Sequence, residues 1–202
     1  MTNRIWTPDD EEQVPRRLEA ASRKLDCVSP KAVVVACLIK PNGNKKWYEG
    51  SNRIMTVGHN YYAAKIAGTV PSPSFADPAM ELGTGATAGF DSSDIMTRAD
   101  LTPKVPLSLK RIDASSGYPK VSDPDPDNAI PILPRILTWR VTYDTSEAIG
   151  TNISHVILLD YAGGSPGASD PVISLAALLI PVPSKTASDA LKIFINHEFR
   201  SP

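Results

Sequence analysis

The sequence predicts a mainly β protein: an antiparallel, jelly-roll-like β-sandwich with one or two short helices and an extended N-terminal arm. The 202 residues include 19 prolines, more than the usual ~5%, and proline interrupts helices. The last third of the chain alternates apolar and polar residues between turn-forming residues, which is typical of strands. Because this length suits one core, we expect residues 1–30 to form the arm and residues 31–202 a single β-sandwich domain.

The arm is polar and charged. Its acidic stretch DDEEQ precedes the basic stretch RRLEAASRK, an order that suits a helix dipole. We therefore expect a short helix from Pro8 to Leu25, interrupted at Pro15. Its apolar stripe is too thin to fold alone, so the arm is expected to lie against another surface, such as a neighbouring subunit.

A hairpin and a helix are expected next. The β-branched run AVVVACLIK begins at Ala32, and PNGN at 41–44 is a turn signal before KKWYEGSN, which together predict a hairpin. The segment IMTVGHNYYAAKIAG at 54–68 predicts a short helix that stops at Gly68.

A glycine-rich stretch follows the expected strand AMEL at 79–82. Glycines permit a bend or a positive φ, and Ser92, Ser93 and Asp94 are expected to cap a short helical turn. The GTGATAG segment resembles a phosphate-binding loop in composition only, because the lysine that such a loop needs is missing. We therefore interpret it as a conformational device that ends a strand.

Six further strands are expected after this stretch. Two of them, one weaker than the other, lie in a Pro-rich region, and the last four carry the clearest alternating or apolar patterns. The expected strands are 105–112, 129–133, 136–145, 152–161, 172–182 and 190–199.

Charge and cysteine content restrict the partners. The formal net charge is −1, so no long-range field attracts nucleic acid or an anionic bilayer. Neither Cys27 nor Cys37 has the spacing of a disulfide framework or a zinc site. Because no apolar run reaches ~18 residues and the first residues lack a signal-peptide apolar region, we expect no membrane partner and synthesis in a reducing cytosol.

Alternating aspartates mark a candidate calcium site. Asp123, Asp125 and Asp127 resemble the start of a calcium loop, but Asn128 replaces the glycine and Pro134 the glutamate that an EF-hand requires. We interpret this segment as a solvated loop, with a surface cation as the alternative.

The three histidines are far apart in sequence, at His59, His155 and His197. Each stands among strand or helix residues, so we interpret them as structural groups rather than as a zinc triad. No G-x-S-x-G elbow marks a nucleophilic serine.

Aromatic residues and carboxylates are the remaining candidate functional groups. Four aromatics are candidate interface anchors, with core packing or scattered exposure as the alternative: Trp6, Trp47, Tyr48 and Tyr118. Four carboxylates near strands are candidates for a glycosidase pair, although nothing in the sequence pairs them: Glu81, Asp144, Asp160 and Glu198. We therefore expect no enzyme activity, no catalytic, cofactor-binding or metal-binding residues, and no cofactor.

Four segments, taken in order, carry a family resemblance: NRIMTVGHNYYAAKIAG, AMELGTGATAGFDSSDIMT, ILTWRVTYDTSEAIGTNISHVILLD and VISLAALLIPVPSKTASDALKIFINHEF. They resemble a β-rich module of tailed-bacteriophage virion proteins, over roughly residues 30–200. The chain departs from the family pattern at several positions, and its Pro-rich segment 113–134 is longer. The departing residues are Met55, Val57, His155, Val156, Ile157 and Leu158.

The resemblance implies a virion structural protein without catalytic residues. We expect a head decoration or cement protein that stabilises neighbouring virion subunits, with a neck, baseplate or tail-fibre adaptor as the alternative. The expected partners are the major capsid protein or tail and neck subunits, within a homo-oligomer that assembles in the host cytoplasm and resides in the virion. A carbohydrate-binding or glycosidase-like β-sandwich is the alternative from another class, because such folds host many functions.

Overall fold

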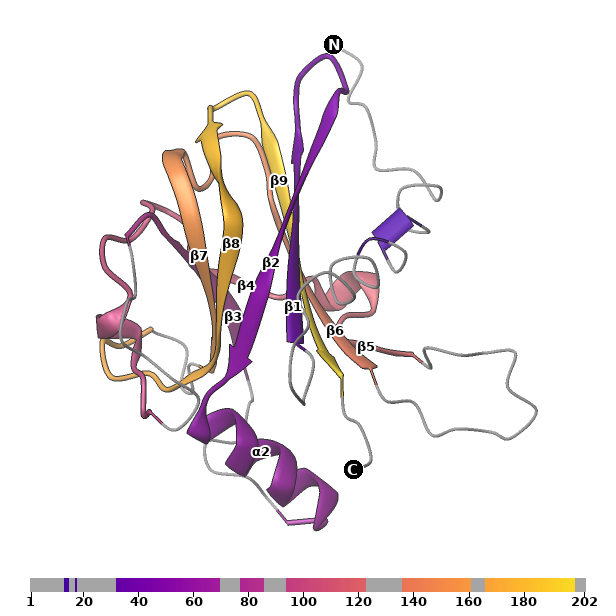
Figure 1. The fold of residues 1–202 in the computed structure, drawn as a ribbon, viewed down its shortest axis with the longest axis vertical. Helices are drawn as coiled ribbons and strands as arrows, with labels where there is room; N and C mark the ends of the chain where they lie inside the picture. The colour runs from indigo at the N-terminus through magenta and orange to yellow at the C-terminus, as the bar shows by residue number, and fades with distance from the viewer. Residues whose placement is uncertain are drawn as a thin grey trace, which may run out of the picture.

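The structure is a computed structural model that describes residues 13–14, 17, 32–69, 77–85, 94–122, 136–160 and 166–198. Its nine strands are all antiparallel and form one sheet in the order β4-β3-β7-β8-β2-β1-β9-β6-β5. The sheet curls into a half-barrel, and helix α2 lies at its lower end (Figure 1). The prediction of a mainly β, antiparallel protein is therefore confirmed.

The strands are β1 (Ala32–Ile39), β2 (Lys45–Ile54), β3 (Pro78–Gly83), β4 (Lys110–Arg111), β5 (Lys120–Ser122), β6 (Ile136–Tyr143), β7 (Gly150–Asp160), β8 (Val172–Lys185) and β9 (Ala190–Glu198). The helices are α2 (Thr56–Ile66) and the 3-10 turns η1 (Arg98–Asp100) and η2 (Ala114–Ser116). The expected hairpin is confirmed as β1 and β2, the expected helix as α2, and the last four expected strands as β6 to β9.

One sheet replaces the two packed sheets that the sequence predicts. The strand β2 pairs with β1 along most of its length and with β8 from Gly50 to Ile54, so it joins the two halves. Because strands twist and the sheet coils, these halves curl round until their inner faces meet. The described strands therefore make a continuous sheet around the core rather than two separate layers.

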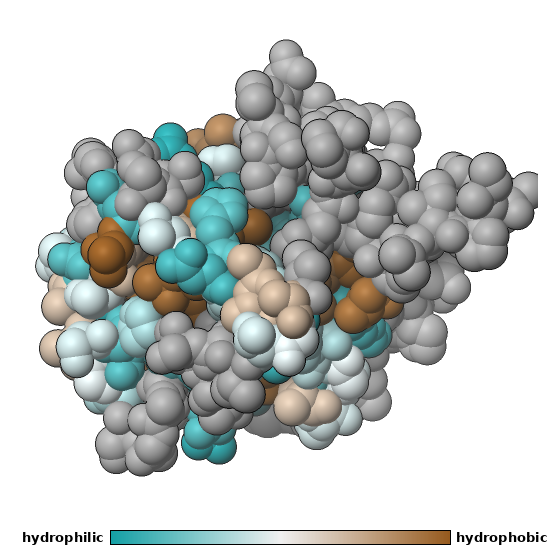
Figure 2. Space-filling model, turned by 90° about the horizontal axis from the view of Figure 1, so that it is seen from below, coloured by the Kyte–Doolittle hydropathy of each residue, from teal (hydrophilic) through white to brown (hydrophobic). Residues whose placement is uncertain are grey.

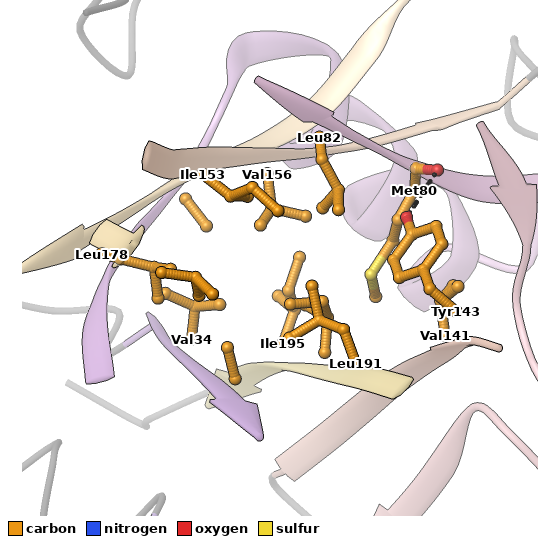
Figure 3. Packing of buried hydrophobic residues seen from close by; sticks show 14 of the residues in the cluster. Val34, Met80, Leu82, Val141, Tyr143, Ile153, Val156, Leu178, Leu191 and Ile195 are labelled. Carbon is orange, nitrogen blue, oxygen red and sulfur yellow. Dashed lines mark hydrogen bonds between the residues drawn. The ribbon is translucent and has the colours of Figure 1, made fainter. Parts of the chain in front are cut away.

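The core lies inside this curl. Val34 of β1 and Ile195 of β9 lie across from Met80 and Leu82 of β3 (Figure 3), and all four belong to one buried cluster. The Tyr143 hydroxyl crosses the core from β6 and donates to the Met80 carbonyl at 3.1 Å. Alternate residues of each strand supply this face, as the period of a strand requires.

The outer face of β3, β7 and β8 is covered as well. Met96 and Leu101, from the segment after β3, pack with Ile157 and Leu175 in a second buried cluster. Burial on both faces explains why the β8 sequence reads as a nearly continuous apolar run rather than an alternating one.

The glycines at the end of β3 and just after it allow close approach of this covering segment. A Cβ on Gly83 would lie 2.6 Å from the Leu101 side chain, and one on Gly85 would lie 2.4 Å from the Thr102 carbonyl oxygen. Neither residue has a positive φ. The glycines thus serve packing, whereas the sequence interpretation invoked a bend.

The helical turn expected near Asp94 begins later, at η1. Thr97 and Asp100 form its capping box, in which the Asp100 carboxylate accepts from the Thr97 backbone N–H at 2.8 Å. The sequence prediction placed the cap too early because several Ser and Asp residues precede the turn.

The strand expected at 105–112 is mostly wrong, since only β4 is extended and paired. Pro106 has no N–H for a sheet, and Leu107 has a φ of 52°. The Ser108 hydroxyl donates to the Val105 carbonyl at 2.6 Å, which stabilises a turn instead.

Two described points of the arm contact the chain's own sheet. Val14 is buried with Val33 and Phe194 on the outer face of β1 and β9. The Arg17 guanidinium lies 4.2 Å from the centre of the Trp47 ring. Several other predicted features lie outside the described residues: most of the Pro8–Leu25 helix, Trp6, Cys27, Ser92, Ser93, the strand 129–133 and the 123–134 loop with its aspartates.

The residues that follow β4 bond to β6 and so join the two edges of the curled sheet. We call this contact, centred on Asp113, the seam. The Asp113 backbone N–H donates to the Arg140 carbonyl of β6 at 2.9 Å. The Asp113 carboxylate accepts from Arg140 Nε at 2.7 Å and from the Thr142 backbone N–H at 3.1 Å. The Arg140 guanidinium also lies 4.3 Å from the centre of the Tyr118 ring. The Asp113 carboxylate thus fastens the residues after β4 to β6 at the opposite edge of the sheet.

Candidate interaction surface

The three histidines do not form a metal site. His59 lies on the exposed side of α2, His155 on β7 and His197 in the interior on β9. Among the described residues, no group of three or more His, Cys, Asp or Glu side chains could hold a metal ion. His155 Nδ1 lies 2.8 Å from the hydroxyl of Ser154, and burial lowers the pKa of its imidazole.

His197 makes stability depend on pH. Burial, followed by the charge of His59, lowers its pKa to about 3, so the unfolded chain binds more protons between about pH 6.5 and 3. Stability therefore falls as the pH falls through this window, by ~2 kcal/mol between pH 7 and 5. Urea unfolding at both pH values measures it: His197→Gln should lose this dependence and His59→Gln should keep most of it. Equal pH dependence in the His197 variant and the parent would contradict the assignment.

The candidate carboxylates have separate partners. Glu81 accepts two hydrogen bonds from Arg98, both at 2.8 Å, and Asp160 accepts from the Asp77 backbone N–H at 3.1 Å. Asp144 lies in the connection after β6, and Glu198 pairs with Ile136 at the end of β9. The described contacts do not bring these four carboxylates together as a glycosidase pair.

The candidate aromatic anchors serve packing in part. Tyr48 and Tyr118 are buried, Trp47 is half-buried, and the Tyr118 ring packs edge-on against Phe194. The core-packing alternative therefore holds for both tyrosines. Cys37 is a buried free thiol, as expected for an ordinary core cysteine.

A charged network organises the end of the sheet opposite α2. We call residues 105–110, 144–149 and 186–189 the distal rim; the last of these segments connects β8 and β9 at the top of Figure 1. Lys185 is buried, and its ammonium donates to the carbonyls of Asp144 at 2.9 Å and Glu147 at 2.6 Å. Lys110 donates to the Glu147 carboxylate at 2.5 Å and to that of Asp144 at 3.3 Å. The two lysines thus fix the connection between β6 and β7.

The contacts within this network shift the pKa values of its ionisable groups. Burial lowers the pKa of the Lys185 ammonium, against the opposing effect of nearby carboxylates. Burial alone would raise the pKa of Glu147, but the hydrogen bond from Lys110 lowers it below its usual value. Both partners of this pair are charged at neutral pH.

Hydrogen bonds connect the rim segments to each other. The Asp189 carboxylate accepts from the Thr186 backbone N–H at 2.8 Å and from Lys40 at 3.0 Å. The Ser146 backbone N–H donates to the Ala187 carbonyl at 3.0 Å. The rim is therefore a cross-braced frame rather than a set of independent loops.

Removal of the Lys185 ammonium should weaken this frame. Lys185→Met leaves two carbonyls without their donor, and we expect a loss of ~1–3 kcal/mol in the free energy of unfolding. Lys65→Met, at an exposed position on α2, should change it by less than ~0.5 kcal/mol. Urea titration of both variants measures the difference, and indistinguishable midpoints would show that Lys185 has no bracing role.

The distal rim also exposes apolar side chains to solvent. Leu107 is 82% exposed and has a φ of 52°, a conformation that costs energy for a leucine. The Ala148 backbone N–H donates to the Leu107 carbonyl at 3.3 Å, and the neighbouring Ile149 is 45% exposed. An exposed leucine on a backbone held in an unfavourable conformation indicates a surface shaped for contact.

A bulge in β8 exposes two further apolar residues. The register runs from His155 opposite Ala177 to Ile153 opposite Val182, so residues 178–181 are irregularly paired. Leu179 is 63% and Ile180 69% exposed in this bulge. By contrast, the coloured part of the α2 end shows apolar groups separated by polar ones (Figure 2).

Sequence reasoning missed the residues that build the rim. Lys185 follows an apolar run, where a lysine is ordinarily an exposed strand end. Its acceptors are backbone carbonyls about 40 positions earlier, and no sequence signal marks a carbonyl as an acceptor.

No family model, curated protein or solved structure matches this chain. Within the part of the chain that the structure describes, no helix is long and apolar enough to cross a membrane. The distal rim therefore stands on its own geometry: a braced frame that displays apolar side chains, which is the usual make-up of a protein-binding surface.

Proposed function

We propose that this protein is a bacteriophage virion structural protein, a head decoration or cement protein that binds neighbouring virion subunits through the distal rim. The observation that carries the proposal is the exposure of Leu107 and Ile149 on the hydrogen-bonded frame of the distal rim. A preorganised surface loses little conformational entropy on binding. The resemblance to β-rich virion modules supplies the identity of the partner.

The curl of the sheet supports a jelly-roll-like β-sandwich as the more specific fold within this proposal. The half made of β3, β7 and β8 faces the half made of β1, β9 and β6 across one apolar core. In the proposed jelly-roll-like reading, these halves of the one curled sheet would take the place of the two layers of a sandwich, with β2 between them. Folds of this kind present rigid connections at their ends to partners.

Charge also fits a short-range mode of binding. A near-neutral protein gains little from long-range steering, so its affinity must come from apolar area and close complementarity. Binding to the particle should therefore persist at high salt, where a purely electrostatic contact is screened.

Mass spectrometry of purified particles tests the proposal. We expect the protein in a fixed ratio to the major capsid protein, before and after a high-salt wash, and a symmetric homo-oligomer by analytical ultracentrifugation. Absence from the particles, with the protein present only as a free monomer in the lysate, would refute the virion assignment and favour the carbohydrate-binding alternative.

A further inference from the structure

Several polar side chains are buried on the inner face of the sheet at the end covered by α2. Asn52 of β2, Ser174 of β8 and His197 of β9 are each more than nine-tenths buried. Tyr62 reaches them from α2, and its hydroxyl lies 2.5 Å from Nδ1 of His197. The surrounding apolar side chains include Ile54 and Leu137, so bulk water does not supply their hydrogen bonds.

The register places these residues along one row of the sheet. Asn52 is opposite Ala176, and Ser174 is opposite Ile54, so Ser174 and Asn52 are diagonal neighbours on the same face. On the other side of Asn52, the β1 position opposite His197 is Ala32. Asn52 and His197 are therefore about two strand spacings apart, roughly 10 Å between backbones.

Four polar atoms in this row have no hydrogen-bond partner among the described residues: Asn52 Oδ1, Asn52 Nδ2, Ser174 Oγ and His197 Nε2. The large majority of buried polar atoms in proteins are paired with protein or with ordered water. Several exceptions gathered in one row point to a bound group that completes them.

The position of the proton on the His197 imidazole determines what this side of the site offers to a ligand. Burial raises the pKa of the Tyr62 hydroxyl, so the hydroxyl keeps its proton. With its proton kept on the oxygen, the Tyr62 hydroxyl can donate to Nδ1 of His197, 2.5 Å away. In this arrangement the imidazole proton is on Nε2, where the N–H meets no acceptor among the residues that the structure describes.

The chemistry of the row selects its ligand. It offers an imidazole N–H, an amide that both donates and accepts, and a hydroxyl that does either. None of these groups is charged, because His197 stays neutral in the interior. A metal ion would face an N–H donor and lacks carboxylates, whereas water donates and accepts and bonds to about three such groups.

We propose that this row is a buried hydration site, in which ordered water molecules join Ser174, Asn52 and His197. Through the hydrogen bond between His197 and Tyr62, the same water network fastens α2 to the interior of the sheet. The site is independent of the distal rim, which lies at the other end of β8.

Whether Tm falls or rises when a polar group of the row is removed tests the proposal. In a hydrated site Ser174→Ala removes a partner of the bound water, and we expect Tm to fall by ~2–4 °C. In a dry site the same change removes an unpaired hydroxyl, and Tm would rise, which would overturn the proposal. Asn52→Leu should give the same sign for the same reason.

Ser108→Ala is the matched control. Its buried hydroxyl already bonds directly to the Val105 carbonyl, so Tm should fall whether or not water occupies the row. A high-resolution crystal structure should show ordered density within hydrogen-bond distance of His197 Nε2 and Asn52. Apolar atoms packed against these groups without such density would overturn the proposal.

Discussion

Replacement of Gly50 by alanine is expected to destabilise the protein by ~3–5 kcal/mol. A Cβ at this position would lie 2.0 Å from the Ala177 carbonyl oxygen and 2.6 Å from the Leu178 Cα. Both obstacles are backbone atoms, so no side-chain rotation relieves the overlap. Gly50 and Leu178 are also a register pair between β2 and β8, and separation of these strands there would open the sheet between its halves.

Urea unfolding followed by circular dichroism measures this loss, with Gly167→Ala as the control. A Cβ on Gly167 would meet its nearest neighbour, the Asp170 carboxylate, at 3.4 Å, an ordinary contact. The control should change stability by less than ~1 kcal/mol. Similar midpoints for the two variants would mean that β2 and β8 are not packed as closely as described.

Replacement of Asp113 by alanine is expected to cost ~3–5 kcal/mol, because it removes a carboxylate that accepts a hydrogen bond from the buried Arg140 guanidinium. The side chains of this pair are only 7% (Arg140) and 14% (Asp113) exposed, and the two charges are 2.7 Å apart. The substitution also removes the acceptor of the Thr142 backbone N–H. The seam that closes the curled sheet would lose its central group.

Thermal and urea unfolding of Asp113→Ala should be compared with Asp77→Ala. Asp77 pairs with Arg111 at 3.3 Å, but these side chains are 28% and 57% exposed, so its loss should cost less than ~1 kcal/mol. Equal effects of the two substitutions would argue that the seam is solvated and does not hold the margins together.

The strands could be predicted wherever one pattern dominates a segment. Alternation marks β6, and the PNGN turn at 41–44 marks the hairpin of β1 and β2. Only a local signal is needed in these cases. The segment around Leu107 failed because Pro106 and a left-handed leucine interrupt a pattern that otherwise resembles a strand.

The arrangement of the strands could not be predicted in the same way. Whether two halves form separate sheets or one depends on the pairing of β2 with both β1 and β8, and strand patterns do not encode partners. The contact between Tyr62 and His197 spans 135 positions, and each residue alone resembles an ordinary helix or strand residue. The distal rim was missed because its acceptors are backbone carbonyls.

Co-sedimentation with particles that lack the protein tests the central claim, that the molecule works by contact through the distal rim. Wild-type protein should sediment with the particles, in low and high salt. A variant with Leu107→Asp and Ile149→Asp, at positions that are 82% and 45% exposed, should keep its Tm and remain in the supernatant. Equal sedimentation of both proteins, or of neither, would contradict the claim.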